Sequence, residues 1–186
     1  MSFLDRIAAA VTPAASDESR NEARRNIDAL ATREPWIQPI VDQHREIEGC
    51  FREAYAAPSH EAVERLATVL TGHANAEEAV LYPDIADQSS KTHAGMAYEE
   101  HAMTKIQLAK LKDLAPGSKE WTEKLEHIES AVAQHIYQEE DSWLPHLAEE
   151  MSPERKARLQ ERYAEEYRRY CGTDSSAVRT GAGAAI

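Results

Sequence analysis

Apolar residues recur every three or four positions along four long segments of the chain, a spacing that predicts amphipathic helices. Turn-forming residues separate these segments: Pro58-Ser59 after the first, a polar stretch at 84–91 after the second, and Pro116-Gly117 after the third. Short turns between long helices favour an all-α fold, an up-down-up-down four-helix bundle. We expect the helices at about 36–57, at 59–82 with a stop at Pro83, at 92–114 and at 118–150.

The segments on either side of the predicted bundle differ from it in composition. An apolar stripe over residues 1–12 predicts an amphipathic helix, and the Ser- and Pro-rich stretch at 12–22 predicts a linker. We expect this N-terminal helical arm to dock on the bundle or to make homo-oligomer contacts with a second copy. Ser152-Pro153 opens an extra C-terminal helix. The expected parts are the arm and linker at 1–35, the bundle at 36–150, the C-terminal helix at 151–171 and a disordered tail at 172–186.

The same motif, H-x3-E-E-x4-P, occurs in the second and the fourth predicted helix. It begins at His73 in the second helix and at His135 in the fourth, while His44 and His101 lie on the apolar stripes of the other two. Counted from the turns, neighbouring histidines differ in depth by one or two residues, which is about 1.5–3 Å at the rise of an α-helix. We therefore expect the four imidazoles to lie in one layer inside the bundle.

A histidine followed by glutamate four residues later is weak evidence by itself, because this chain is rich in glutamate. Five such pairs occur, at His44, His60, His73, His135 and His146. Those at His73 and His135 share an apolar stripe, a matching depth, a second glutamate and a following proline, a combination that the other three lack. That combination makes these two the specific signal.

A buried layer of four histidines and two glutamates is unfavourable unless cations neutralise it, because each buried charge costs on the order of several kcal/mol. The alternative is a set of core histidines, each bonded to its own carboxylate one turn on. Ferritin-like di-iron bundles use Glu-x-x-His pairs, which this sequence lacks, and the zincin motif HExxH is also absent. We therefore predict a nitrogen-rich site for two metal ions, with the ligands His44, His73, Glu77, His101, His135 and Glu139.

Four more side chains lie close to these residues along the helices. Glu78 and Glu140 point about 100° away from the ligand face and are expected at the surface or behind the ligands. Glu48, one turn after the first-helix histidine, is a candidate additional ligand or outer partner. Tyr98, one turn before the third-helix histidine, is a candidate phenolate or redox-active neighbour, although a purely structural role is the plainer interpretation of both.

Charge and composition exclude several classes of partner. The formal net charge of −12 at pH 7 repels phosphate backbones and anionic lipid. No apolar run approaches the roughly 20 residues of a membrane span. The two cysteines, Cys50 and Cys171, form no CxxC motif and suit a reducing compartment. The sequence therefore predicts a cytoplasmic protein that binds neither nucleic acid nor membrane.

The ligand pattern resembles that of the hemerythrin-like (HHE cation-binding) domain over about residues 36–148. The resemblance implies two iron ions joined by an oxo or hydroxo group and by Glu77 and Glu139, with manganese or zinc as substitutes. The four histidines would then be terminal ligands. Of about twelve octahedral positions, two would stay open for O2, H2O2 or NO.

The chain departs from the oxygen-carrying hemerythrins at two places. Those proteins carry a second histidine one turn from the third-helix histidine, where this chain has Ala97 and Lys105, and their last carboxylate is a more distant aspartate instead of Glu139. The pattern instead resembles hemerythrin-like proteins that handle peroxide or nitrosative stress and the bacterial repair-of-iron-centres proteins. We therefore expect reaction with O2, peroxide or NO, with a catalase- or peroxidase-like activity as the candidate enzyme function. The alternatives are a non-enzymatic oxygen carrier and an iron or oxygen sensor.

Overall fold

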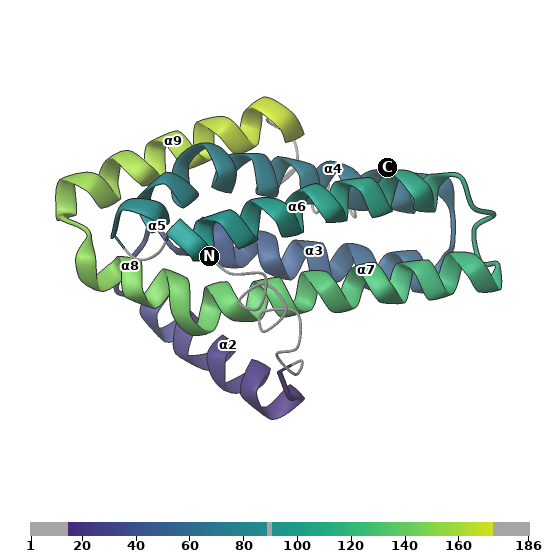
Figure 1. Ribbon diagram of the computed structural model, residues 1–186, viewed down its shortest axis with the longest axis horizontal. Coiled ribbons are helices and arrows are strands. Elements are labelled where there is room, and N and C mark those ends of the chain that lie inside the picture. Colours follow the sequence, from purple (N-terminus) through teal and green to yellow (C-terminus); the bar gives the residue numbers. More distant parts are fainter. Residues whose placement is uncertain (1–14, 89–90, 173–186) are drawn as a thin grey trace, which may run out of the picture.

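Every element in the described part of the computed structural model is a helix (Figure 1). The structure describes residues 15–88 and 91–172, and the all-α prediction is confirmed for them. The helices are α2 (Asp17–Ala31), α3 (Gln38–Ala56), α4 (His60–Ala76), η1 (Glu77–Leu81), α5 (Tyr82–Gln88), α6 (Lys91–Lys112), α7 (Lys119–Gln138), η2 (Glu139–Trp143), α8 (Leu144–Glu150) and α9 (Pro153–Cys171), of which η1 and η2 are π-helical.

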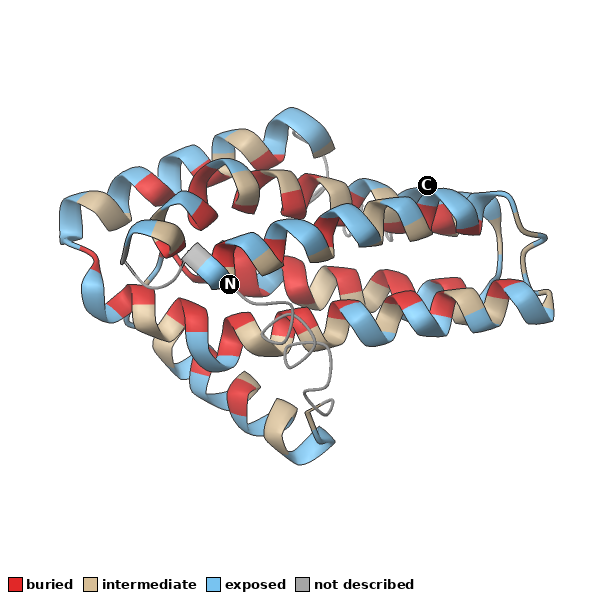
Figure 2. Ribbon diagram, viewed as in Figure 1, coloured by how far each residue is buried: buried red, intermediate tan, exposed pale blue. Residues whose placement is uncertain are grey.

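Four long helices, α3, α4, α6 and α7, lie side by side along the longest axis of the molecule (Figure 1). Helix α3 packs against α4 and α7, and α6 packs against the same two, so the four enclose a common interior. Helix α9 covers α4 and η1, and α2 lies across η2. Figure 2 shows that the buried positions face inward along these helices, as amphipathic stripes require.

Serine side chains cap the starts of several helices. The side-chain oxygen of Ser59 accepts a hydrogen bond from the Ala62 N–H at the start of α4. At the start of α2, Ser16 caps in the same way and Asp17 follows in the first turn, where a negative charge is favourable. The prediction of a linker at 12–22 is therefore wrong from residue 17 onward. The arm helix predicted at 1–12 and the tail predicted beyond Gly172 lie outside the described residues.

The prediction that the second bundle helix stops at Pro83 is wrong. The helix continues through η1 into α5. In η1 the Tyr82 N–H donates to the Glu77 carbonyl five residues earlier, which is the π-helical spacing. Because Pro83 has no N–H, the next carbonyl, that of Glu78, has no backbone donor at this spacing. The hydroxyl of Tyr98 on α6 donates to that carbonyl instead, at 2.8 Å. The π turn and this side-chain donor together allow the helix to pass the proline.

The second copy of the motif forms the same local structure. In η2 the Leu144 N–H donates to the Glu139 carbonyl, again five residues earlier, just before Pro145. Both π segments therefore begin at the motif's first glutamate and end before its proline. Because π turns inside α-helices occur often at functional sites, the two segments direct attention to the residues around them.

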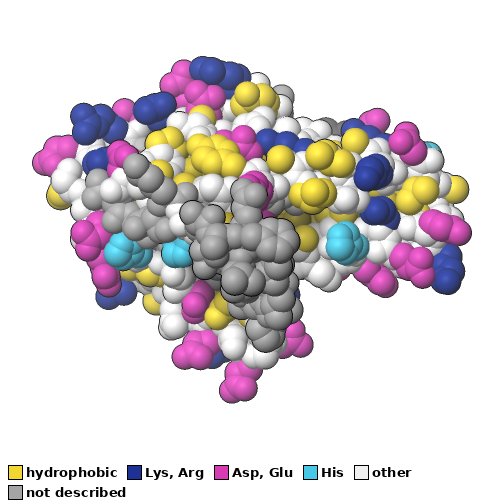
Figure 3. Space-filling model, in the orientation of Figure 1, with side chains coloured by type: hydrophobic (Ala, Val, Ile, Leu, Met, Phe, Trp, Pro, Cys, Tyr) yellow, Lys and Arg dark blue, Asp and Glu magenta, His cyan; other side chains and the backbone are white. Residues whose placement is uncertain are grey.

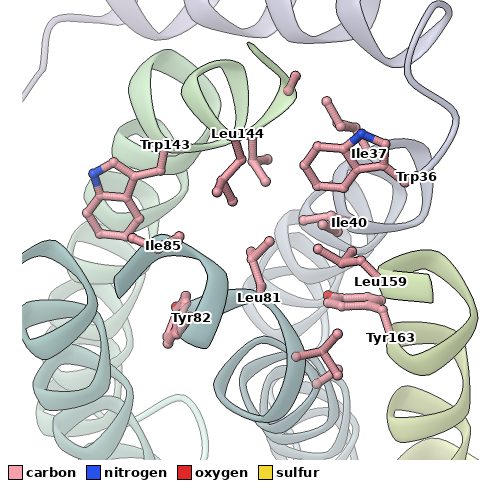
Figure 4. Packing of buried hydrophobic residues seen from close by; sticks show 14 of the residues in the cluster. Trp36, Ile37, Ile40, Leu81, Tyr82, Ile85, Trp143, Leu144, Leu159 and Tyr163 are labelled. Carbon is pink, nitrogen blue, oxygen red and sulfur yellow. The ribbon is translucent and has the colours of Figure 1, made fainter. Parts of the chain in front are cut away.

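Two apolar clusters fill the interior, one on each side of the histidine layer. One cluster contains Ile40 of α3, Leu81 of η1 and Trp143 of η2, together with residues of α9 (Figure 4). The other contains Ile47 of α3 and Leu125 of α7. Along α3, His44 lies between Ile40 in the first cluster and Ile47 in the second. The polar layer is thus closed off by hydrocarbon on both sides along the bundle.

Candidate metal centre

A layer of buried polar side chains lies between the two apolar clusters. Its two glutamates are fully buried, and no histidine in it exceeds 6% exposure. The layer receives one histidine from each of α3, α4, α6 and α7 and one glutamate from each of η1 and η2. The structure therefore brings together all six residues that the sequence predicted as ligands: His44, His73, Glu77, His101, His135 and Glu139.

Each glutamate faces two histidines through its two oxygen atoms. For Glu77, Oε1 lies 3.2 Å from Nε2 of His73 and Oε2 lies 3.5 Å from Nε2 of His101. For Glu139, Oε2 lies 3.1 Å from Nε2 of His44 and Oε1 lies 3.3 Å from Nε2 of His135. A carboxylate with one oxygen toward each of two sites has the arrangement of a bridging ligand.

The candidate donor atoms form two groups that share one carboxylate. Within each group, one donor atom from every residue lies within 4.8 Å of the others. His101 and His135 belong to one group and are close neighbours, with their Nε2 atoms 3.1 Å apart. The groups are His44, His73, Glu77 and Glu139, and Glu77, His101 and His135. The histidines thus divide evenly between the two positions.

Two unpaired atoms in this layer indicate that it binds a cation. Among the described residues, Nε2 of His73 and Oε1 of Glu77 are buried and have no hydrogen-bond partner, although they lie only 3.2 Å apart. A buried polar atom without a partner costs about 1–3 kcal/mol. A divalent cation between the nitrogen and the oxygen would remove that cost for both, so the residues fit a metal ion.

All four imidazoles point Nε2 toward the layer and use Nδ1 to contact an outer oxygen atom. For His44 the partner is Glu140, one of the two glutamates predicted to lie at the surface or behind the ligands, and for His101 it is the other, Glu78. An Nδ1–H that donates to an outer oxygen leaves Nε2 with a lone pair for a metal. The Nδ1 contacts are His44–Glu140 at 2.8 Å, His101–Glu78 at 3.2 Å, His135–Glu100 at 2.7 Å and His73–Gln43 at 3.0 Å, with the Tyr163 hydroxyl 3.1 Å from His73.

Without metal, protons distribute themselves unequally over these groups. Burial lowers the pKa of His44, but hydrogen bonds to Glu139 and Glu140 outweigh burial and raise it to about 9. For Glu77, burial and repulsion from Glu139 raise the pKa well above its usual range. Burial opposes ionisation of Glu139 too, but the neighbouring His135 and His44 hold its pKa well below that range. Protons on His44 and Glu77 therefore stand where metal ions would bind, and metals must displace them.

Tyr82 was missed by the sequence analysis and lies at the centre of the layer. It is fully buried. Its hydroxyl lies 3.0 Å from Nε2 of His101 and 3.1 Å from Nε2 of His135, and it is 3.3 Å from a carboxylate oxygen of each glutamate. Burial, and then the nearby Glu77 and Glu139, raise the pKa of this phenol well above its usual range. The phenol therefore keeps its proton in the metal-free protein.

Tyr98 and Glu48, the two neighbours that the sequence suggested, lie outside the layer. Tyr98 is 40% exposed, and its ring makes a T-shaped contact with that of Tyr82, with centroids 5.2 Å apart. Glu48 pairs with Arg24 of α2 and lies 3.7 Å from Arg45, which in turn binds the outer glutamate of His44. The structure thus separates both side chains from the candidate ligand atoms by at least one residue.

None of the described helices is long and apolar enough to cross a membrane. A comparison with curated proteins matches 85 residues, at 29% identity, to a protein named "DNA nickase" from Nostoc sp. (strain PCC 7120 / SAG 25.82 / UTEX 2576). The match covers 46% of this chain and 24% of that relative, so the chain corresponds to only a small part of it. No solved structure matches.

A comparison with protein families matches residues 37–147 to the hemerythrin HHE cation binding domain. That span includes all six candidate ligands and more than half of the sequence, and the chain therefore belongs to the hemerythrin HHE cation-binding family.

Proposed function

We propose that this protein is a non-haem di-iron protein that reacts with O2, peroxide or nitric oxide, in the handling of oxidative or nitrosative stress. The observation that carries the proposal is the pair of fully buried glutamates, each with one oxygen toward a histidine of either group. His44 and His73 would hold one iron, His101 and His135 the other, and the two glutamates would bridge them. The bound irons would supply open positions for the small molecule and would exchange electrons with it.

The protein's own side chains would keep this centre dry and fixed in place. The two apolar clusters exclude water along the bundle, where α3, α4, α6 and α7 would form the up-down-up-down arrangement. The outer glutamates fix the ring orientations of three histidines, and Gln43 with Tyr163 fixes the fourth. Four Nε2 atoms are thus oriented toward the layer before metal arrives and displaces the bound protons.

Tyr82 favours a chemical reaction of the small molecule at the centre over its reversible binding. Its hydroxyl holds a proton within 3.3 Å of both glutamates and of His101 and His135, and the Tyr82 side chain is itself fully buried. A fixed proton donor in the layer favours the breakdown of peroxide over the release of intact oxygen, since the disproportionation of two H2O2 to O2 and two H2O needs proton transfer but no outside reductant. The proposal therefore includes a peroxide-consuming activity.

The test compares Tyr82→Phe with Tyr98→Phe in iron-loaded protein. We expect Tyr82→Phe to retain its iron but to consume peroxide about 10²-fold more slowly, the lower range for loss of a general acid. Tyr98→Phe, which lacks the direct contacts, should stay near the wild-type rate. Recovery of the colourless reduced state on deoxygenation, with no peroxide consumption, would make the protein an oxygen carrier and overturn the proposal.

A sensor is the second candidate, because helices outside the matched domain contact the ligand layer. From α9, the Tyr163 hydroxyl lies 3.1 Å from Nδ1 of His73. From α2, Asp28 lies 3.6 Å from Arg45, which binds Glu140, and Glu140 binds His44. Metal occupancy could thus alter the packing of α2 or α9. Protease cleavage within α2 or α9 that changes with iron loading, in a protein that does not consume peroxide, would favour this function.

Two points bear on the cellular setting. The described cysteines, Cys50 and Cys171, are both free, which is compatible with the reducing cytoplasm that we propose. The nicking activity named for the Nostoc relative belongs to a much longer protein, and the charge of −12 argues against a nucleic-acid partner for this chain.

A further inference from the structure

A pocket opens between α6 and α7 and reaches the candidate metal centre. Its volume is about 210 Å³, and the side chains of His101 and His135 form part of its wall. Figure 3 shows hydrophobic side chains gathered on the face of the molecule that carries α6, where Met103 is 54% exposed and lines this pocket. The pocket therefore connects an apolar patch of the surface with the part of the layer that contains His101 and His135.

The size of this pocket exceeds what O2, peroxide or nitric oxide requires. A water molecule occupies about 30 Å³ in the liquid, and an apolar cavity of about 150 Å³ is large enough to hold benzene. At about 210 Å³ the pocket has room for one aromatic ring with a small substituent. Its size therefore indicates an organic molecule in addition to the small oxidant.

The lining indicates that this molecule carries no charge. The inner wall is hydrocarbon, from Leu70, Leu108, Ile128 and Val132. The polar side chains in the wall include four that already bind other groups of the protein: Lys105 binds Asn75 and Glu78, Glu100 binds His135, Gln107 binds Lys124, and Gln134 binds the backbone N–H of Ala15. Thr104 and the exposed His127 also line the pocket, but a charged ligand held against the buried His101 and His135 would have to break these contacts or enter hydrocarbon without a partner, and both are unfavourable.

We propose that this pocket binds a small, uncharged, apolar organic molecule of about one aromatic ring, held against His101 and His135. Its role as an organic co-substrate at the centre rests on the proposed function, but the binding itself does not require iron. The metals would lie on the Nε2 side of the two imidazoles, which leaves their ring edges for contact with this ligand.

The test is calorimetric titration of the full-length protein with toluene, and with benzoate, which has the same ring and one negative charge. We expect one toluene site per chain and no benzoate binding at the same concentrations. Ala131→Phe and Thr104→Phe narrow the pocket from its two walls and should weaken toluene binding at least about tenfold, or 1.4 kcal/mol. Ala109→Phe is the matched control, because Ala109 is exposed on α6 and does not line the pocket.

Four results would overturn this inference: no toluene binding, equal binding of benzoate, unchanged binding in both pocket variants, or an equal loss in Ala109→Phe. Two wall variants are included so that misfolding of one leaves the other to decide. Iron content is measured separately on the same samples. Toluene binding by a protein without iron would support the pocket and contradict the di-iron proposal, so the two failures can be told apart.

Discussion

At the scale of single residues, the proposed metal centre depends most on its two fully buried glutamates, Glu77 and Glu139. Glu139 is fully buried between His44 and His135, and without cations it would be a carboxylate held only by those imidazoles and the Tyr82 hydroxyl. Glu150 also follows a histidine by four residues, but it is exposed at the end of α8. Glu139 and Glu150 thus share the same spacing from a preceding histidine but differ in burial and in partners.

The first prediction compares Glu139→Gln with Glu150→Gln. We expect Glu139→Gln to lose at least one of two metal ions per chain, because the amide is neutral and a poor bridging ligand. Glu150→Gln should keep the metal content of the wild type. Elemental analysis after iron-replete expression measures this, and equal metal retention in both variants would contradict the assignment of Glu139.

The second prediction concerns the pH dependence of the metal-free protein. The pKa of His44 rises from 6.5 to about 9 on folding, so its stabilising contribution is complete below pH 6.5 and is lost as pH rises toward 9. The raised pKa values of His135 and Glu77 act in the same direction, and the lowered pKa values of His73 and His101 oppose them only near the unfolded-state pKa of 6.5. Thermal melts of chelator-treated protein should therefore show a falling melting temperature from pH 6.5 to 9. A melting temperature that rises over this range would contradict the proton assignment, and iron-loaded protein serves as the control.

At the scale of elements, the π segments explain what the sequence could predict and what it could not. Helical periodicity was enough to place the four histidines and two glutamates in one buried layer, because regular α-helix runs up to the first residue of the π segment, Glu77. Beyond that turn the count fails: in a regular α-helix Tyr82, five residues after Glu77, would point about 140° away from it. The π spacing returns Tyr82 to the ligand face. The sequence feature that could have indicated the π segments is the proline of the repeated motif, because neither proline ends its helix.

The partners behind the histidines, on the Nδ1 side of each ring, were equally hard to predict. The carboxylates behind His44 and His101 are those next to the ligands in sequence, Glu140 and Glu78, and the sequence had left open whether they lie at the surface. Tyr163 reaches His73 from α9, about ninety residues away. A single sequence contains no register between distant helices, so such a contact becomes visible only once they are packed.

The third prediction tests that contact from α9. Tyr163→Phe removes a hydroxyl that lies 2.8 Å from Gln43 and 3.1 Å from His73 in the core. We expect a loss of about 1 kcal/mol in the free energy of unfolding, together with weaker metal retention, because the orientation of His73 is less fixed. Tyr170→Phe is the matched control, since that ring is 51% exposed. If urea titrations gave equal stability for both variants, α9 would have no such role.

At the scale of the whole molecule, the polar layer divides the hydrophobic interior into two clusters. A continuous apolar core would be more stable than one interrupted by four imidazoles and two carboxylates, unless metal ions neutralise the layer. The helices outside the matched domain, α2 and α9, cover η2 and η1, where the motif glutamates lie. The molecule is therefore organised around a layer whose stability depends on what it binds.

The most direct test of this account is the number and identity of the metal ions in the purified full-length protein. Elemental analysis after iron-replete expression should give about two irons per chain, as expected for two donor groups that share a carboxylate. One tightly held zinc and no iron, or no bound metal at all after iron-replete expression, would contradict the central claim.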